Sequence, residues 1–112
     1  MNITFKTRKL EKVLNQEERL NKEFGADKAR RIQWRMAVLS NAPTLLHVPY
    51  QKPERRHQLS GKQKEEFAVD VSKNYRLVFT PNHDPIPTQD DGGYDLDKIT
   101  AIKILRVEDY HK

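Results

Sequence analysis

The sequence predicts an α+β fold, in which a pair of helices packs on one face of a mostly antiparallel β-sheet. Two changes of pattern lead to this prediction. Apolar residues recur every three to four positions over 9–39, which is typical of amphipathic helices, and they alternate with polar residues from residue 67 onward. The expected order is β-α-α-β-β-β-β. At 112 residues without an internal repeat, the chain is expected to form a single domain, 1–112.

The first half of the chain supplies a short strand and the two helices. Residues 2–5 alternate as a strand does, and the spacing of apolar residues predicts a helix over 9–25 that ends at Gly25. Asp27 is a suitable N-cap for a second helix, which Pro43 ends. Because the link between the helices is so short, we expect an antiparallel helical hairpin.

The second half predicts the sheet. Residues 67–71 and 75–80 alternate strictly and are separated by the turn 72–74, which is typical of a β-hairpin. A further strand is expected at 56–61. After a long polar loop, the stretch ITAIKILRV (99–107) predicts a strand with apolar residues on both faces, and therefore a central strand that is covered on both sides.

Composition restricts the possible functions. The absence of cysteine excludes disulfides and cysteine-based metal or redox sites, and no apolar run is long enough to span a membrane. We expect no contact with a membrane and, since the N-terminus does not resemble a signal peptide, a cytoplasmic location. The net charge is +5, but residues 81–97 hold five aspartates and no basic residue. The remainder carries 21 basic against 11 acidic groups, which favours a polyanionic partner such as nucleic acid over a merely soluble surface.

Basic residues concentrate in one segment of the chain. Residues 52–64 contain five that could contact RNA phosphates, namely Lys52, Arg55, Arg56, Lys62 and Lys64. The alternative is that they only keep a loop soluble. Neither His47 nor His83 has a partner at metal-ligand spacing, and no glycine-rich turn suggests a nucleotide site, so we expect neither a metal nor a cofactor.

Five further residues could perform chemistry together. Arg76 interrupts an apolar strand, so its guanidinium must face water, a ligand anion or a carboxylate, for example Asp70 across the hairpin. Metal-free RNA cleavage needs a base, an acid and a cation, which His57, His111 and Arg76 could supply. Near the end of the chain Asp109 could orient an imidazole, and Tyr110 could stack on a base or hydrogen-bond the phosphate. The alternative is a set of surface histidines and a solvated tail.

Four segments together resemble one known family. RHQLSG (56–61), FAVDV (67–71), YRLVF (75–79) and ITAIKILRVEDYH (99–111) are similar to the HigB-like toxins of the RelE/ParE toxin–antitoxin superfamily, and the likeness covers nearly the whole chain. The resemblance implies a RelE-like fold. It also implies a metal-independent endoribonuclease that cuts mRNA in the 30S decoding site of the ribosome, beside 16S rRNA. Such cleavage leaves a 2′,3′-cyclic phosphate and a 5′-hydroxyl, and inhibits translation and growth.

The same resemblance implies residue roles and partners. Asp109, Tyr110 and His111 match a terminal catalytic triplet, Arg76 matches an arginine that contacts the scissile phosphate, and His57 lies where relatives carry another active-site histidine. The expected partner is a HigA-like helix-turn-helix antitoxin, with operator DNA bound only through the complex. Two alternatives share this fold: a ParE-like toxin that binds DNA gyrase without catalysis, and an inactive toxin that acts as a co-repressor.

Overall fold

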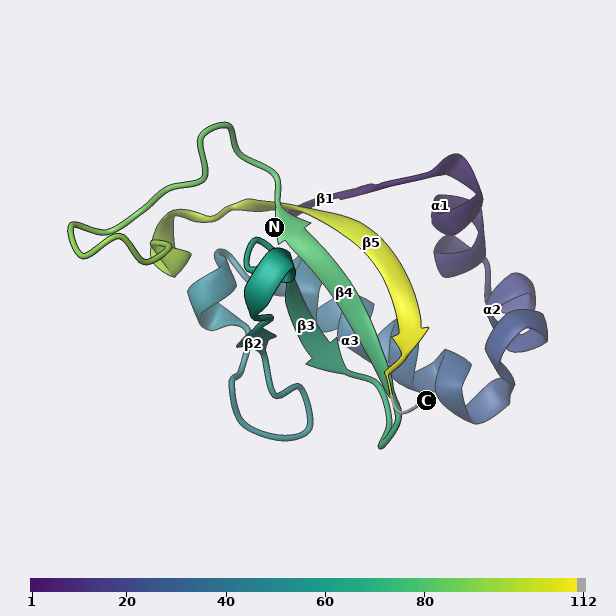
Figure 1. Ribbon diagram of the computed structural model, residues 1–112. Helices are drawn as coiled ribbons and strands as arrows, with labels where there is room; N and C mark the ends of the chain where they lie inside the picture. Colours follow the sequence, from purple (N-terminus) through teal and green to yellow (C-terminus); the bar gives the residue numbers. More distant parts are fainter. Residues whose placement is uncertain (111–112) are drawn as a thin grey trace.

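The computed structural model describes residues 1–110, which form a five-stranded sheet with helices on one face (Figure 1). The strand order is β1-β5-β4-β3-β2, with β1 parallel to β5 and every other pair antiparallel. The strands are β1 (Asn2–Phe5), β2 (His57–Gln58), β3 (Phe67–Asp70), β4 (Tyr75–Pro81) and β5 (Ala101–Asp109). The predicted α+β class and mostly antiparallel sheet are confirmed.

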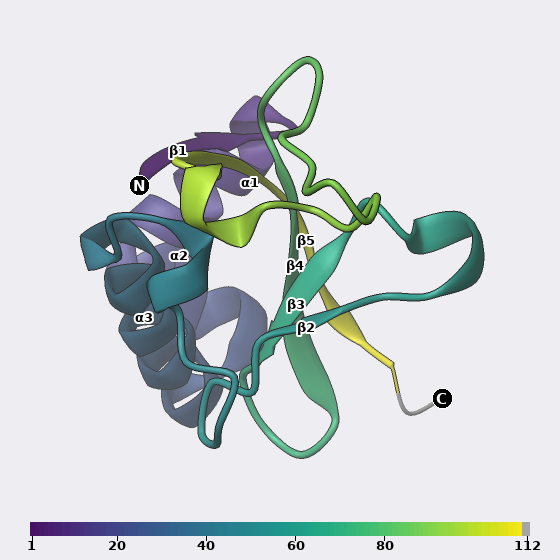
Figure 2. The same ribbon diagram turned by 90° about the vertical axis from the view of Figure 1, so that its left-hand side faces the viewer.

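The helices lie together on one side of the sheet, and the other face is left open (Figure 2). They are α1 (Arg8–Asn15), α2 (Glu17–Phe24) and α3 (Ala26–Asn41). Alternation along the strands sends Val69, Leu77 and Ile104 toward these helices, where they are completely or almost completely buried. The core therefore lies between the helical layer and one face of the sheet.

The open face carries only a small apolar cluster. Leu59, Ala68 and Val78 are buried there, and Leu105 packs against them while partly exposed. The prediction that the last strand is central is confirmed, because β5 lies between β1 and β4. The prediction that it is covered on both sides is wrong: in the described chain the α-helices lie on one face of the sheet only (Figure 2). On the other face the side chains of Leu105, Arg106 and Glu108 are only partly buried.

The helix predicted over 9–25 is two helices, because Gln16 adopts an extended conformation (φ −124°, ψ 116°). The break lets α1 contact β1 while α2 contacts α3. Apolar spacing did not reveal it, since the five apolar residues of 9–25 would share one face of a continuous helix as well. The next helix follows Gly25 directly, so Asp27 lies in the first turn of α3 and is not its N-cap.

The strand predictions hold with shifted boundaries. The hairpin of β3 and β4 is confirmed, whereas the strand expected at 56–61 is reduced to the two residues of β2. The last strand begins two residues later than expected and continues to Asp109. Short 3₁₀ turns occur at η1 (Leu45–His47), η2 (Gly61–Gln63) and η3 (Leu96–Lys98). The long acidic loop between β4 and β5 lies at the end of the sheet opposite the β3–β4 turn (Figure 1).

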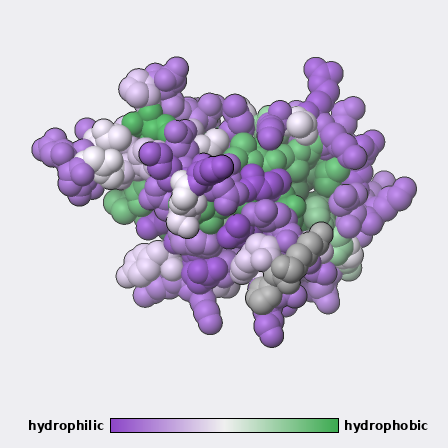
Figure 3. Space-filling view, in the orientation of Figure 1, coloured by the Kyte–Doolittle hydropathy of each residue, from purple (hydrophilic) through white to green (hydrophobic). Residues whose placement is uncertain are grey.

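The surface of the open face is mainly hydrophilic (Figure 3). Hydrophobic side chains gather where β5 passes α1, and a groove there is lined by Leu10, Val13, Phe24, Leu105 and Val107 among others. Within residues 1–110, no helix combines the length and apolar character that crossing a membrane requires.

Candidate active site

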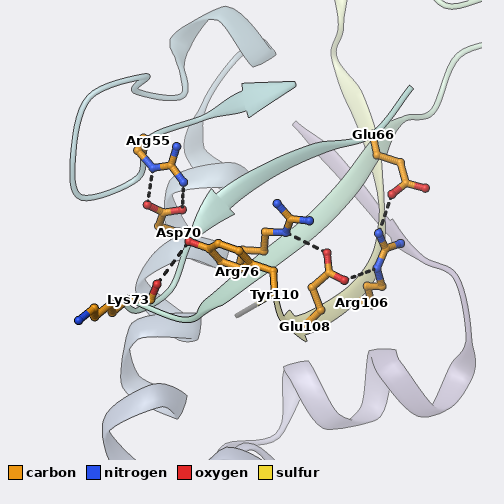
Figure 4. A network of polar contacts seen from close by, with 8 residues as sticks. All are labelled: Arg55, Glu66, Asp70, Lys73, Arg76, Arg106, Glu108 and Tyr110. Carbon is orange, nitrogen blue, oxygen red and sulfur yellow. Dashed lines mark hydrogen bonds and ion pairs between the residues drawn. The ribbon is translucent and has the colours of Figure 1, made fainter. Parts of the chain in front are cut away.

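Arg76 lies on the open face of β4, between carboxylates on both neighbouring strands. In the sheet register it is opposite Asp70 of β3 and Glu108 of β5. Its Nε donates to Oε1 of Glu108 at 2.9 Å. The ion pair considered from the sequence, to Asp70, is not the one that forms, because Arg55 occupies that carboxylate. The guanidinium of Arg76 also stacks on Tyr110, at 4.5 Å from the ring centre (Figure 4).

Further ion pairs extend across the open face (Figure 4). Arg55 binds both carboxylate oxygens of Asp70, at 2.6 and 3.0 Å. Arg106 donates to Glu108 at 3.3 Å and to Glu66 at 2.7 Å. With Arg76, three arginines therefore face three carboxylates, and the charges of the network cancel. A net positive potential at this site has to come from residues around the network.

Glu108 is held as a carboxylate by its two arginines. Partial burial by itself favours the neutral carboxyl, but the hydrogen bonds and charges of Arg76 and Arg106 outweigh it and lower the pKa of Glu108 below its ordinary value. Glu108 is thus a charged acceptor that fixes the direction of the Arg76 side chain.

The terminal nitrogens of Arg76 remain available to a ligand. Among residues 1–110, Arg76 donates a hydrogen bond only through Nε, and neither Nη group has an acceptor. The side chain is 17% exposed, so it is held mostly out of water while one edge stays accessible. A planar guanidinium with free Nη groups suits a phosphate, which accepts two parallel hydrogen bonds.

The end of β5 is fixed beside this arginine. The backbone N–H of Tyr110 donates to the carbonyl of Asn74 at 3.1 Å, and its hydroxyl donates to the carbonyl of Lys73 at 3.4 Å. Asp109 is opposite Tyr75 in the register, so alternation places it on the helix side of the sheet while Tyr110 reaches the open face. His111, the third member of the predicted triplet, lies outside the described residues.

His57 lies on the same face as Arg76 but is not in contact with it. It pairs with Ala68 at the outer edge of the sheet, two strands and two residues away from Arg76, or about 12 Å between Cα atoms. Its Nδ1 is 2.8 Å from the carbonyl oxygen of Arg55. Because a carbonyl only accepts, Nδ1 carries a proton, and Nε2 of the neutral ring can accept one.

The five predicted RNA-binding residues separate into different environments. Arg55 is tied to Asp70, whose hydrogen bond raises the pKa of that guanidinium. Arg56 donates through Nη1 to the carbonyls of Leu45, Leu46 and Val48 at 2.8–3.1 Å. Desolvation lowers its pKa, so Arg56 supports the η1 segment from inside. Lys62 and Lys64 line a separate hollow with two glutamates, and Lys52 lines a cleft beside α3.

This cleft of about 650 Å³ lies between α3, residues 52–55 and the β3–β4 turn. Trp34 and Tyr110 both line it, together with Arg31 and Lys73. The sequence analysis did not single out Trp34 or Glu108. Glu108 precedes Tyr110 by two residues, but its place opposite Arg76 depends on the β4–β5 register, which the sequence alone does not reveal. Trp34 could have been found as the chain's single tryptophan within the basic stretch ARRIQWR.

The described residues show no group of three or more His, Asp or Glu side chains placed to hold a metal ion.

Comparisons with known proteins identify the fold. No family model matches the sequence, and no curated protein sequence matches it. Among solved structures, a YoeB/ParE toxin from Agrobacterium tumefaciens superposes with a TM-score of 0.60 at 7% identity, over 99% of this chain and all of that one. The YoeB dimer from Staphylococcus aureus gives 0.54 at 17% identity, and the YoeB–YefM complex from the same organism gives 0.52 at 16%. Both cover 100% of this chain and 98% of theirs.

Each superposition covers nearly the full length of both proteins, although the sequence identity of 7–17% is too low for sequence comparison to detect the relationship. The protein therefore has the fold of the YoeB/ParE toxins, with the strand order and helical layer described above. The RelE-like fold expected from the resemblance is confirmed.

Proposed function

We propose that this protein is the toxin of a toxin–antitoxin system of the RelE/ParE superfamily, and that it is an endoribonuclease that cuts mRNA on the ribosome. The observation that carries the proposal is the stack of Arg76 on Tyr110, with both Nη groups of the arginine free of acceptors within residues 1–110. The stack holds a cation with an exposed edge at the end of β5, where the sequence places Tyr110 and His111. The toxin fold supports the class, and the HigB-like motifs support the activity.

The reaction needs no group beyond the chain and the RNA. The ribose 2′-oxygen loses its proton to a base and attacks the adjacent phosphorus, and the bond from phosphorus to the 5′-oxygen breaks. An acid gives its proton to the departing 5′-oxygen, so the products are a 2′,3′-cyclic phosphate and a 5′-hydroxyl. Arg76 would stabilise the extra negative charge on the phosphate oxygens through Nη1 and Nη2.

Proton transfer is assigned to His111, which follows Tyr110 directly, while Asp109 is proposed to favour its charged form. His57 would reach the same phosphate only across two strands, although its Nε2 is free to accept a proton. Glu108 has a supporting role in this scheme, because it orients Arg76 without touching the RNA.

A partner follows from the same proposal. The S. aureus YoeB was solved in a complex with YefM. We propose that this chain likewise binds a cognate antitoxin, of the HigA-like helix-turn-helix type that the HigB resemblance implies, and reaches operator DNA only through it. The toxin would act in the cytoplasm, where mRNA is translated.

The proposal is tested by inducing the protein without its antitoxin and mapping mRNA ends by ligation that requires a 5′-hydroxyl. Wild type is expected to arrest growth and to produce such ends. Arg76→Lys keeps the charge but loses the planar fork and its stack, and is expected to lower cleavage by at least 100-fold. Arg19→Lys, on the exposed surface of α2, is the matched control and should cleave normally.

The histidines are compared in the same assay. His111→Ala is expected to abolish cleavage, and His57→Ala to reduce it less. Growth arrest with intact mRNA and trapped DNA–gyrase complexes would favour the gyrase-binding alternative and refute the proposal. Absence of any toxicity would favour the co-repressor.

A further inference from the structure

We propose that the cleft between α3 and the β3–β4 turn binds the single-stranded RNA next to the cleaved phosphate, with Trp34 as the surface on which a base stacks. This inference rests on the proposed function, since it names the path of that substrate. It assigns a binding role to Trp34, Arg31 and Lys73, which none of the motifs discussed above includes, and places the predicted RNA-binding residue Lys52 beside them.

Trp34 is placed as a ligand-binding side chain, not as part of the core. It lies on α3 between Ile32 and Arg35, which point inward and are buried, yet 54% of Trp34 is exposed. Exposing an indole to water is unfavourable, because the ring could bury a large apolar area elsewhere. A flat, rigid ring beside cations suits stacking by nucleic-acid bases, every one of which presents a π-face.

Three exposed cations line the cleft together with Trp34. Arg31, Lys52 and Lys73 line the same cleft, come from three different segments and are exposed. Within residues 1–110 none of the three forms an ion pair. Among the described residues, Asp70 is the one carboxylate that lines the cleft, and Arg55 already neutralises it through two hydrogen bonds. The cleft is therefore the positive region that the neutral ion-pair network lacks.

The walls of the cleft are held in position by a buried arginine. Arg35 is 7% exposed and its Nε donates to the carbonyl of Asp70 at 2.6 Å, which ties α3 to the end of β3. Its Nη1 lies 4.0 Å from Glu54, on the segment that forms the opposite wall. A site whose walls are fixed in advance loses less conformational entropy when a flexible strand binds.

The cleft is continuous with the candidate active site. Tyr110 lines it and also stacks on Arg76, so one side chain separates the cleft from the proposed phosphate position (Figure 4). An RNA strand with its scissile phosphate at Arg76 would pass Tyr110 and enter the cleft. There the three cations would contact its next phosphates, and Trp34 would stack on one base.

An acidic peptide is the competing occupant, because it would also satisfy the cations. Besides the rings of Trp34 and Tyr110, the apolar lining within residues 1–110 consists of Pro53 and Val71, and Val71 is 1% exposed. Apart from the two aromatic rings, the cleft thus offers a peptide few places for aliphatic side chains, whereas cations beside stacking rings are what a nucleic-acid strand requires. The observations favour RNA.

The single tryptophan of the chain allows a direct measurement. The full-length protein is titrated with a short oligoribonucleotide carrying 2′-O-methyl groups, which cannot be cleaved, and the fluorescence of Trp34 is followed. We expect saturable quenching. With a labelled oligonucleotide and anisotropy as the readout, Trp34→Ala should bind roughly 5- to 100-fold more weakly, and Trp34→Phe should retain most of the affinity.

The cations are tested by the salt dependence of binding. Replacing Arg31, Lys52 and Lys73 together by glutamine should reduce the slope of log affinity against log salt by about 2, since each single-strand phosphate contact contributes roughly 0.7. The matched control replaces Lys12, Arg19 and Lys22, three exposed cations of α1 and α2, by glutamine, which changes the net charge equally. Its slope should stay close to that of wild type.

Three results would overturn the inference. Anisotropy could show binding while the fluorescence of Trp34 is not quenched, the two triple variants could change the salt slope equally, or an acidic peptide of the same charge could bind and quench Trp34 as tightly as RNA.

Failure of the proposed function is recognised separately. In that case wild type would leave mRNA intact on ribosomes, whatever the oligonucleotide does. If the proposed function holds, Arg76→Lys should lose cleavage while still showing quenching of Trp34.

Discussion

The guanidinium of Arg76 lies 4.5 Å from the centre of the Tyr110 ring, and the same arginine donates to Glu108 at 2.9 Å. A side chain with several rotatable bonds is thereby held from two directions. The ring of Tyr110 restricts the plane of the guanidinium, and the carboxylate of Glu108 holds its Nε edge. The two Nη groups of Arg76 therefore point away from Glu108. Arg76, Glu108 and Tyr110 thus form one preorganised anion-binding group, although Arg76 is far from the other two in the sequence.

The first prediction concerns the ring of Tyr110. Tyr110→Phe keeps the stack on Arg76 and should lower the rate of mRNA cleavage less than tenfold if the ring's main role is to orient the arginine. Tyr110→Ala removes the stack and should lower the rate by 100-fold or more, mainly in kcat. Cleavage of a reporter mRNA on ribosomes measures both. Equal losses in the two variants would show that the hydroxyl is what matters.

The second prediction is a dependence of stability on pH through Glu108. Its pKa is lowered on folding: burial works against this, but the hydrogen bonds from Arg76 and Arg106 prevail. A lowered carboxyl pKa adds to the free energy of unfolding above the ordinary value near about 4.3. That contribution disappears as the pH falls through the lowered pKa.

We therefore expect wild type to be more stable than Glu108→Gln at pH 7, and the difference to shrink below about pH 4. Urea denaturation over a pH series measures it. Glu23→Gln, at an exposed position with no ion pair in the described chain, should show a nearly constant difference. A pH-independent difference for Glu108→Gln would mean that the charge of the carboxylate does not stabilise the fold.

The sequence was informative where a local pattern determines the structure. The β3–β4 hairpin was predicted because its strands alternate and a three-residue turn connects them, so register and facing follow from the turn. The side of the sheet on which Arg76 lies followed from the same alternation. The break at Gln16 could not be predicted in this way, since apolar spacing is the same with or without it and the choice is made by contacts with β1 and α3.

The partner of Arg76 was missed for a related reason. Glu108 belongs to β5, which a loop of about twenty residues separates from β4, and a bulge between Val78 and Phe79 shifts the register of the two strands. Neither the loop nor the bulge could be resolved from one sequence. The cleft at Trp34 was missed because it is built by segments from both halves of the chain, which only the folded structure brings together.

The third prediction concerns Gly25, which joins α2 directly to α3. Its φ of 84° and ψ of 159° lie in a region that is nearly exclusive to glycine. A methyl group there would meet no atom within 4 Å, so any cost of Gly25→Ala comes from the backbone alone. We expect a loss of about 1–3 kcal/mol in the free energy of unfolding, measured with urea. Gly93→Ala lies in an exposed loop and has no positive φ; its new Cβ would be 3.2 Å from Oδ1 of the exposed Asp91, which can rotate away, so the change should be less than about 0.5 kcal/mol.

The fourth prediction compares two arginines on adjacent turns of α3. Arg35→Leu leaves the carbonyl of Asp70 and the largely buried Glu54 without the cation, and should lower the free energy of unfolding by about 2–4 kcal/mol. Arg31→Gln removes an exposed cation that has no ion pair in the described chain, and should change stability by less than about 0.5 kcal/mol. Similar losses would contradict the structural role given to Arg35.

The last prediction concerns the acidic loop, whose role the sequence left open. The loop is anchored by Tyr94, which packs against Phe67 at 6.3 Å between ring centres, so deleting it would damage the core. Replacing the exposed Asp84, Asp90 and Asp91 by asparagine removes three of its five negative charges and keeps that anchor. The loop lies at the end of the sheet opposite the β3–β4 turn (Figure 1), whereas Tyr110 is hydrogen-bonded to Lys73 and Asn74 of that turn. The seven residues of β4 between the two ends span about 20 Å, roughly twice the distance over which exposed charges interact at physiological salt. Cleavage on ribosomes and quenching of Trp34 should therefore change less than twofold, while affinity for the cognate antitoxin is expected to fall. A loss of cleavage with normal antitoxin binding would place this loop on the RNA path instead.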